Sequence, residues 1–205
     1  PPLASDCVPT PDAPPGLGWN FLIPAHVIMG PRFTPNDGDE LAFMERPNGH
    51  PIHYRIYRYR ISTNTLFLLR EGDHFTNMTN PLDWGGNGWI LLNLGSSSED
   101  ANIFKMKDDG DSLIQLTFSS WNFNPVWSPS CQSFGYRHTG GGLGRSVLVN
   151  TITNEQDTLF SAPLSTQVYW FEEDRIAYTQ VQYGMDPISL CNVALDECQA
   201  IGTNP

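Results

Sequence analysis

Lysine is nearly missing from this sequence of 205 residues, which holds only Lys105 and Lys107. Charged residues make up 16% of the chain, and 22 acidic against 11 basic side chains give a formal net charge of −11. Such a surface repels phosphate backbones, so nucleic acid is excluded as a favoured partner. No uncharged apolar run approaches the ~18 residues that a membrane-spanning helix needs. No basic and apolar leader stands at the start either, so we expect any signal peptide to lie upstream and to have been removed.

The motifs of common hydrolases and phosphate-binding enzymes are also missing. There is no Gly-x-Ser-x-Gly nucleophile elbow, and the run Gly140–Gly144 lacks the Lys-Ser/Thr of a P-loop. None of the four cysteines stands in a Cys-x-x-Cys pair or at zinc-ligand spacing from a histidine. His50 and His53 are three residues apart in an extended segment, where their side chains do not share a face as they would on a helix. The sequence therefore favours a non-catalytic protein with no metal site.

One acidic run invites a calcium interpretation. Asp108-Asp-Gly-Asp111 offers carboxylates, which are suitable ligands for a hard cation. The spacing lacks the Glu of an EF-hand loop, and Asp-Gly is the ordinary chemistry of a hairpin turn. We favour the turn, keep calcium as the alternative and expect no other cofactor.

Glycine and proline are abundant, with 18 and 17 residues, while hydrophobic residues make up 40% of the chain and aromatics 12%. So much aromatic side chain can form a core, and so many helix breakers argue against a helical bundle. Trp84, Trp127 and Trp170 follow one another at intervals of 43 residues, and Phe33 takes the same place in an earlier unit. A repeat of this length is typical of a protein built from stacked supersecondary units.

Each unit reads as four short strands separated by turns rich in Gly, Asn and Asp, with no helical period. Four strands per unit at a period in the low forties is the signature of a β-propeller blade. The recurrent aromatic residue is expected to be buried between neighbouring blades rather than to form a ligand platform. We therefore predict an all-β chain, a small β-propeller of four-stranded antiparallel blades. An N-terminal segment of residues 1–30 precedes units at about 31–79, 81–122, 125–165 and 168–202.

A known repeat resembles one unit closely. The run Asn102-Ile-Phe-Lys-Met-Lys-Asp-Asp-Gly-Asp-Ser-Leu-Ile-Gln-Leu-Thr117, followed by Pro125-Val-Trp-Ser-Pro129, is similar to the TolB-type (WD-like) β-propeller repeat. The match is close over 102–137 and weaker elsewhere, because Ser130-Cys131 stands where the family has Asp-Gly and the unit at Trp170 lacks Ser-Pro. The resemblance implies a propeller of the bacterial periplasm or cell envelope, with a protein partner on its axial face.

The number of blades stays open at this point. Four units can be read, and the run Leu17–Pro24 could add a strand that completes or closes a blade. A six-bladed ring, as in the TolB family, would need about 260 residues at this period. The chain is therefore either a miniature of four or five blades or a segment of a longer propeller.

Aromatic and amide side chains gather in Ser119–Asn124, which we expect to form the loop between the second and third units on the axial face. Trp121, Asn122 and Phe123 would offer a flat contact surface for a partner there. The equivalent loop of the first unit holds His74 and Phe75. The alternative is that Trp121 folds back and packs on its own blade.

An even number of cysteines in a lysine-poor chain suits an exported protein with two disulfides, with four buried free thiols as the alternative. Cys191 ends the third strand of the last unit and Cys198 begins its fourth strand, so we expect them to face each other in a disulfide. Cys7 and Cys131 would then form the second disulfide.

These features favour a non-catalytic exported β-propeller that acts as a protein-binding or scaffold module of the bacterial cell envelope. Two alternatives stay open. One is a carbohydrate-binding module or degenerate glycan hydrolase, for which exposed aromatics and acids would serve. The other is the propeller domain of a larger enzyme whose catalytic part lies outside this chain.

Overall fold

A computed structural model describes residues 27–36, 38–46, 53–73, 81–140, 144–162, 168–179, 188–192 and 197–201. Within these ranges the protein consists of β-strands, turns and a short 3-10 helix, η2 (Ser98–Asp100), and it has no α-helix. The described part likewise contains no helix of the length and apolarity needed to cross a membrane. The predicted all-β class is confirmed.

Sixteen strands of the described chain form four separate four-stranded sheets, and every pairing is antiparallel between neighbours in sequence. We number the sheets blade 1 to blade 4. Blade 1 contains β1 (Val27–Phe33), β2 (Glu40–Arg46), β3 (His53–Arg60) and β4 (Thr65–Asp73). Blade 2 contains β5 (Leu82–Trp84), β6 (Trp89–Leu94), β7 (Asn102–Lys107) and β8 (Ile114–Gln115). Blade 3 contains β9 (Asn122–Trp127), β10 (Ser133–His138), β11 (Gly144–Asn150) and β12 (Gln156–Ala162). Blade 4 contains β13 (Val168–Glu172), β14 (Arg175–Thr179), β15 (Ile188–Asn192) and β16 (Glu197–Ile201).

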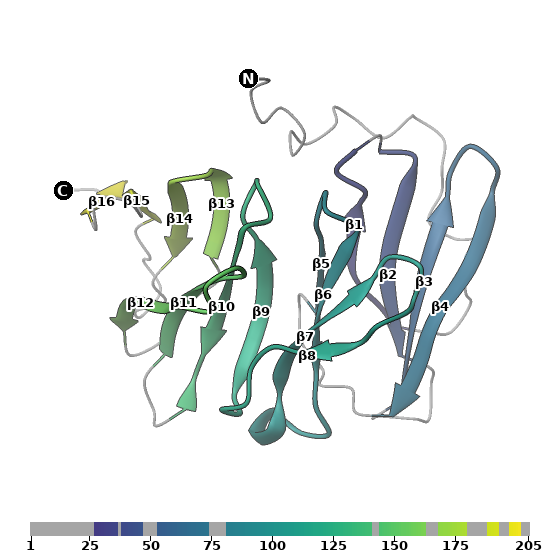
Figure 1. The fold of residues 1–205 in the computed structure, drawn as a ribbon, viewed down its shortest axis with the longest axis horizontal. Coiled ribbons are helices and arrows are strands. Elements are labelled where there is room, and N and C mark those ends of the chain that lie inside the picture. Colours follow the sequence, from purple (N-terminus) through teal and green to yellow (C-terminus); the bar gives the residue numbers. More distant parts are fainter. Residues whose placement is uncertain are drawn as a thin grey trace.

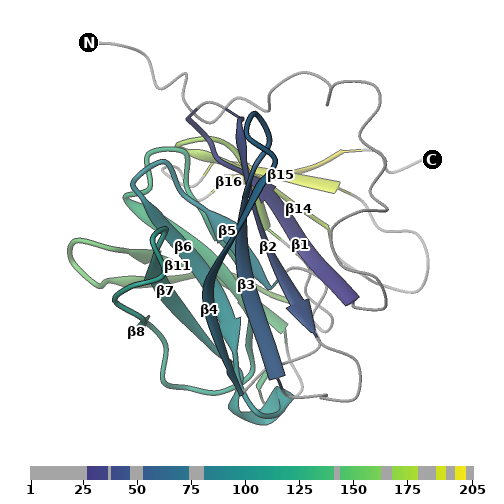
Figure 2. The ribbon, with the colours of Figure 1, turned by 90° about the vertical axis from the view of Figure 1, so that its right-hand side faces the viewer.

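The four blades stand side by side in chain order, from blade 1 on the right of Figure 1 to blade 4 on the left. Seen from the side of blade 1, the other sheets lie behind it (Figure 2). The first strand of each blade is the innermost, because β1 contacts β5, β5 contacts β9 and β9 contacts β13. This is the blade arrangement of a β-propeller.

The recurrent aromatic residues occupy equivalent positions in the four blades. Each lies in the innermost strand and pairs with the second residue of the next strand. The pairs are Phe33 with Leu41, Trp84 with Ile90, Trp127 with Phe134, and Trp170 with Ile176. The structure therefore confirms the register that the 43-residue interval predicts.

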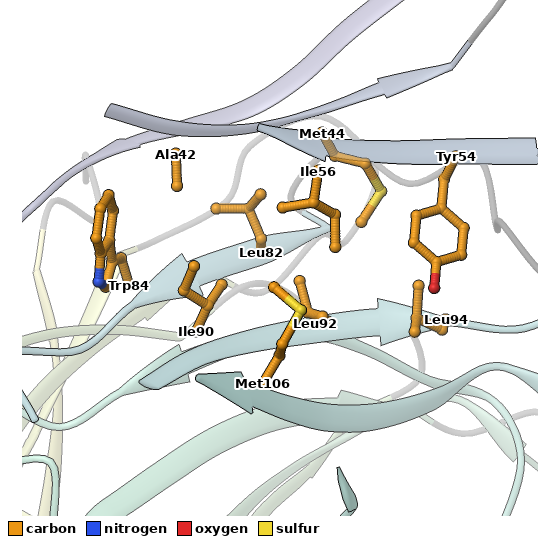
Figure 3. Packing of buried hydrophobic residues seen from close by; sticks show 10 residues of the cluster. All are labelled: Ala42, Met44, Tyr54, Ile56, Leu82, Trp84, Ile90, Leu92, Leu94 and Met106. Atoms are coloured by element: carbon orange, nitrogen blue, oxygen red, sulfur yellow. The ribbon is translucent and has the colours of Figure 1, made fainter. Parts of the chain in front are cut away.

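Each tryptophan packs on the blade before its own. Trp84 belongs to the core between blades 1 and 2, where Ala42 and Met44 face Leu82 and Leu92 (Figure 3). Trp84 and Trp127 are both 6% exposed, as expected, whereas Trp170 is only partly buried. Phe33 is 42% exposed, because its face of blade 1 points away from blade 2. The main core thus consists of successive apolar layers between blades.

Strand bounds differ from the expected units at two places. β1 begins at Val27, and its pairing with β2 shifts between Met29 and Arg32. Gly30 lies in this irregularity with a φ of +57°, and a side chain there would come within 2.7 Å of Pro81. The Gly-Pro pair therefore marks a bulge within the strand rather than its start. The second difference, at the start of blade 3, concerns the candidate site.

Candidate binding face at the β8–β9 connection

The chain crosses from blade 2 to blade 3 through residues 116–121, which we call the axial loop. Its first part continues along β7, because the amides of Leu116 and Thr117 both donate to the carbonyl of Ile103. Its last part lies against the end of β10, where the amide of Thr139 donates to the carbonyl of Trp121 at 3.0 Å. The loop is thus hydrogen-bonded to both blades.

The axial loop presents two aromatic side chains to solvent. Phe118 is 80% exposed and Trp121 is 36% exposed. Ser120 and Trp121 have φ values of +55° and +56°, a left-handed conformation that costs a non-glycine residue roughly 1–2 kcal/mol. Two consecutive residues of this kind persist only where the surrounding structure holds them, and such strain clusters at functional sites.

The side chain of Asn122 fixes the axial loop through buried hydrogen bonds. Its side chain is fully buried, and its amide nitrogen donates to Oδ1 of Asn102 and to Oγ1 of Thr117, both at 3.1 Å. Its amide oxygen lies 2.9 Å from Nδ1 of His138, so the imidazole donates that hydrogen. Three strands and the loop therefore meet at one buried amide.

A second asparagine joins the two blades beneath the loop. The side-chain amide of Asn93 donates to the carbonyl of Asn122 at 2.6 Å and to that of Asn102 at 3.2 Å. Thr117 also accepts a bond of 2.9 Å from the amide of Ile103. A buried network with so many satisfied groups fixes one geometry, so the exposed aromatics stand on a rigid base.

His138 is the titratable member of this network. Burial lowers the pKa of its imidazole, the positive charge of Arg145 lowers it further, and a hydrogen bond with the Ser120 backbone partly opposes both effects. The neutral ring that donates to Asn122 is therefore the form present at pH 7. Arg145 is exposed and pairs directly with His138 across β10 and β11.

The structure separates the residues that the sequence groups in this loop. Trp121 is partly exposed, but Asn122 and Phe123 are 0% and 5% exposed, so the expected exposure of Phe123 is wrong. The reason is that β9 already begins at Asn122, and pairing with β10 turns Phe123 into the blade. His74 and Phe75 lie outside the described residues.

Sequence reasoning missed three residues of the candidate site, which are Phe118, His138 and Asn93. The signal for Phe118 was an aromatic residue directly before two serines, outside the alternating pattern of β8. No local signal identifies His138 or Asn93, because their partners come from other strands or from another blade.

The predicted disulfides fall in two different situations. Cys191 and Cys198 are directly opposite each other on β15 and β16, as the expected pairing requires. Cys131 is instead a buried free thiol, packed near Trp127 and Phe134, and burial raises its pKa. The structure therefore does not have the expected Cys7–Cys131 bond, and Cys7 itself lies outside the described residues.

The acidic run after β7 forms a turn. The side chain of Asp109 accepts the amide of Asp111 at 2.9 Å, and Gly110 has a φ of +95°. A side chain at Gly110 would collide with the carbonyl of Leu69 in blade 1, which explains the glycine. Within the described ranges, no three His, Cys, Asp or Glu side chains gather as a metal site would need.

A cavity of about 420 Å³ opens between the outer parts of blades 1 and 2. Hydrogen bonds from Ser96 and Ser97 lower the pKa of Asp100 at its edge to about 2, outweighing the opposing effect of burial, so this carboxylate is ionised. The polar and aromatic residues that line this cavity include Tyr54, Arg70, Asp73, Asp100, Phe104 and Gln115. Acceptors, donors and rings are thus mixed in one recess.

No protein-family model matches this chain, and no curated protein sequence matches it significantly. Several solved structures, in contrast, superpose well on this chain. TolB from Acinetobacter baumannii superposes with a TM-score of 0.69 at 15% identity, covering 85% of this chain and 43% of TolB. A nidogen/laminin complex superposes with a TM-score of 0.65 at 14% identity, and the match covers 87% of this chain and 65% of that structure's chain. An oligogalacturonate lyase in complex with manganese superposes with a TM-score of 0.65 at 13% identity, and the match covers 86% of this chain and 54% of the lyase chain.

The likeness to these structures, at low sequence identity, shows the fold alone, which is a TolB-like β-propeller. The chain spans less than two thirds of the length of each of the three structures. The three neighbours include an enzyme as well as proteins that are not described as enzymes, so the fold does not decide the activity.

Proposed function

We propose that this chain is a non-catalytic β-propeller module that binds a protein partner through the axial loop. The observation that carries the proposal is the exposed pair Phe118 and Trp121 in a loop whose Ser120 and Trp121 have left-handed backbone and whose base is a buried polar network. Rigid aromatic anchors lose little conformational entropy on binding and are frequent hot spots of protein interfaces.

One structural neighbour supports a binding role. It is a nidogen/laminin complex, so a fold of this kind occurs in a protein–protein assembly. The likeness to TolB supports a setting in the bacterial periplasm or cell envelope, where a scaffold module would be exported. The acidic surface, with a net charge of −11, disfavours nucleic acid as the partner.

A second candidate function is glycan binding at the cavity between blades 1 and 2. Its favouring observation is the mixture of Arg70, Asp100 and Gln115 with the Tyr54 and Phe104 rings around about 420 Å³. Paired polar groups beside aromatic rings suit a ligand with many hydroxyl groups. Saturable binding of neutral oligosaccharides, lost in Gln115→Ala, would favour this candidate.

Site-specific photo-crosslinking tests the leading proposal. A photoreactive phenylalanine analogue replaces Phe118, and the matched control replaces Ile152, which is 74% exposed in the turn at the other end of blade 3. We expect one discrete adduct at position 118 in envelope extracts, absent at position 152 and lost when Trp121→Ala is added. Equal labelling at both positions, or none at position 118, would exclude the axial loop as the docking site.

A further inference from the structure

The face of blade 3 that points toward blade 4 carries one guanidinium. On β10, Gly135 and Arg137 lie on this face, and Arg137 pairs with Ser146 on β11 and with Phe123 on β9. Trp170 of blade 4 packs onto the same face, with its indole nitrogen 3.6 Å from the position that a Cβ on Gly135 would take. Residues two apart on a strand are about 7 Å apart on one face, so Arg137 and Trp170 are neighbours.

Three buried donors on this face have no hydrogen-bond partner among the described residues. They are Nε of Arg137, Oγ of Ser146 and Nε1 of Trp170. Ser146 is fully buried, whereas the side chains of Arg137 and Trp170 are only partly buried, although Nε of Arg137 and Nε1 of Trp170 are themselves buried. Native proteins satisfy buried polar groups, so three donors on one face without an acceptor among the described residues favour an acceptor that comes from outside this part of the chain.

Among the described residues, no carboxylate compensates the charge of Arg137. A guanidinium stays protonated in proteins, and the pKa of Arg137 is lowered by burial alone, with no contribution from a neighbouring carboxylate. Elsewhere in the same fold this problem is solved internally, because Arg32 donates to the carboxylate of Asp83 at 3.1 Å. Nε of Arg58 and Nε of Arg70 are also buried without an acceptor, but Arg58 donates through Nη1 to the carbonyl of Asp108 and Arg70 hydrogen-bonds to Tyr54. Arg137 has no such partner among the described residues.

The sequence around Arg137 keeps acids away. No Asp or Glu occurs from residue 112 to residue 154, although the chain holds 22 acids in total. Arg145 and His138 lie within this stretch, and Arg145 lowers the pKa of His138. The charged side chains of this stretch are therefore the guanidinium groups of Arg137 and Arg145, which lie on opposite faces of the sheet, so Arg137 is the group that an anion on the face toward blade 4 would meet.

We propose that Arg137, together with Ser146 and Trp170, binds a carboxylate group of an acidic segment in the protein partner. This inference rests on the proposed docking at the axial loop. Arg137 lies two residues before Thr139, whose amide donates to Trp121, so one partner can cover both places. A single guanidinium matches the single charge and planar shape of a carboxylate, which it can bind through two parallel hydrogen bonds.

The stability of two matched variants tests whether the guanidinium is unsatisfied in the free protein. Arg137→Met keeps the aliphatic stem and removes the charge, and Arg145→Met does the same at an exposed position on the opposite face of the sheet. We expect Arg137→Met to raise Tm by about 2–4 °C and Arg145→Met to leave it unchanged. A lower Tm for Arg137→Met would mean that the fold already satisfies this group, and the inference would be overturned.

Nuclear magnetic resonance with sodium acetate as the probe tests the carboxylate chemistry. The side-chain N–H signals of Arg137 and Trp170 should shift saturably with acetate but not with sodium chloride at equal ionic strength, and Ser146→Ala should weaken the effect. The indole N–H of Trp127 is an internal control, because it already donates to the carbonyl of Trp89 at 3.2 Å. Absence of a saturable shift at Arg137 would overturn the proposal.

A crosslinking arm separates this inference from the proposed function. With the photoreactive residue at position 118, Arg137→Met should lower the yield of the partner adduct roughly tenfold or more, and Arg145→Met should change it little. An unchanged yield in Arg137→Met would leave the axial loop as the docking site and exclude the partner's carboxylate from Arg137. An acetate response without any adduct at position 118 would refute the protein partner and point to a free carboxylic acid instead.

Discussion

The backbone amide of Trp127 donates a hydrogen bond of 2.8 Å to Oδ2 of Asp83, a residue of the preceding blade. The other carboxylate oxygen of Asp83 accepts a bond of 3.1 Å from Nε of Arg32 in blade 1. The side chain of Asp83 is only 15% exposed, and burial raises its pKa, while the bond from Trp127 and the charge of Arg32 oppose that rise. One carboxylate thus joins the innermost strands of three blades.

Replacing this carboxylate should loosen the junction of the three blades. Asp83→Ala leaves the amide of Trp127 and the guanidinium of Arg32 without their acceptor, so we expect the free energy of unfolding to fall by about 1–3 kcal/mol. Urea unfolding measures the loss. Asp157→Ala removes an exposed acid on β12 and should change stability little. Equal effects of the two variants would show that the three-blade bond contributes nothing specific.

The tryptophan on the other side of this bond should be a core residue. Trp127 is 6% exposed and packs on blade 2, so Trp127→Ala should cost ~3–5 kcal/mol as a large-to-small change in the core. Trp121→Ala, in the exposed axial loop, is the matched control and should cost far less. A loss below about 1 kcal/mol for Trp127→Ala would assign this residue to a surface site.

Stability should depend on pH through His138. Its pKa in the folded protein lies below the ordinary value of 6.5, because burial and Arg145 disfavour the charged ring. The unfolded chain therefore binds more protons between the two pKa values, and stability is lost as the pH falls through 6.5 toward the folded-state pKa. His138→Gln should flatten this part of the profile.

A titration of the imidazole signals checks the sign directly. Arg145→Gln removes the neighbouring positive charge, so the pKa of His138 should rise in that variant. A pKa of His138 above 6.5 in the parent protein would contradict the buried, neutral ring that donates to Asn122.

The opposed cysteines of blade 4 should form a disulfide. Cys191 and Cys198 are paired in register on β15 and β16, and closing so short a loop should stabilise the protein by about 2–3 kcal/mol. Mass spectrometry after alkylation without reductant should find this pair linked and Cys131 alkylated once the protein is unfolded. Four alkylated cysteines would refute an exported, oxidised protein, and a Cys131–Cys198 bond would refute the strand register.

What could be predicted from the sequence is what the chain repeats locally. The interval between Trp84, Trp127 and Trp170 follows from stacking similar sheets, and it leads to the blades, their strand order and the register of the aromatic positions. Asp109-Gly110 identifies its turn because hairpin geometry demands those residues.

What the sequence hides depends on partners in other blades. Asn122 and Phe123 follow two serines and a tryptophan and read as a loop, yet pairing with β10 makes them the start of a strand. The amide of Asn93 donates to the carbonyl of Asn102 on the next strand of its own blade and to that of Asn122, 29 residues away, which only the stacking of blades 2 and 3 brings close. Likewise, the missing partner of Arg137 becomes visible only once the facing sheet is known.

The packing of each tryptophan on the preceding blade gives the molecule a direction during its synthesis. Leu91 and Ile103 of blade 2 are fully buried, but the cluster that buries them contains Trp127 of blade 3. A nascent chain that has completed blade 2 therefore exposes this apolar surface until Trp127 leaves the ribosome. At roughly 5–20 residues per second, the delay is on the order of seconds for each blade. Successive blades thus pass through the same exposed stage, at which a general chaperone that recognises apolar strands would bind.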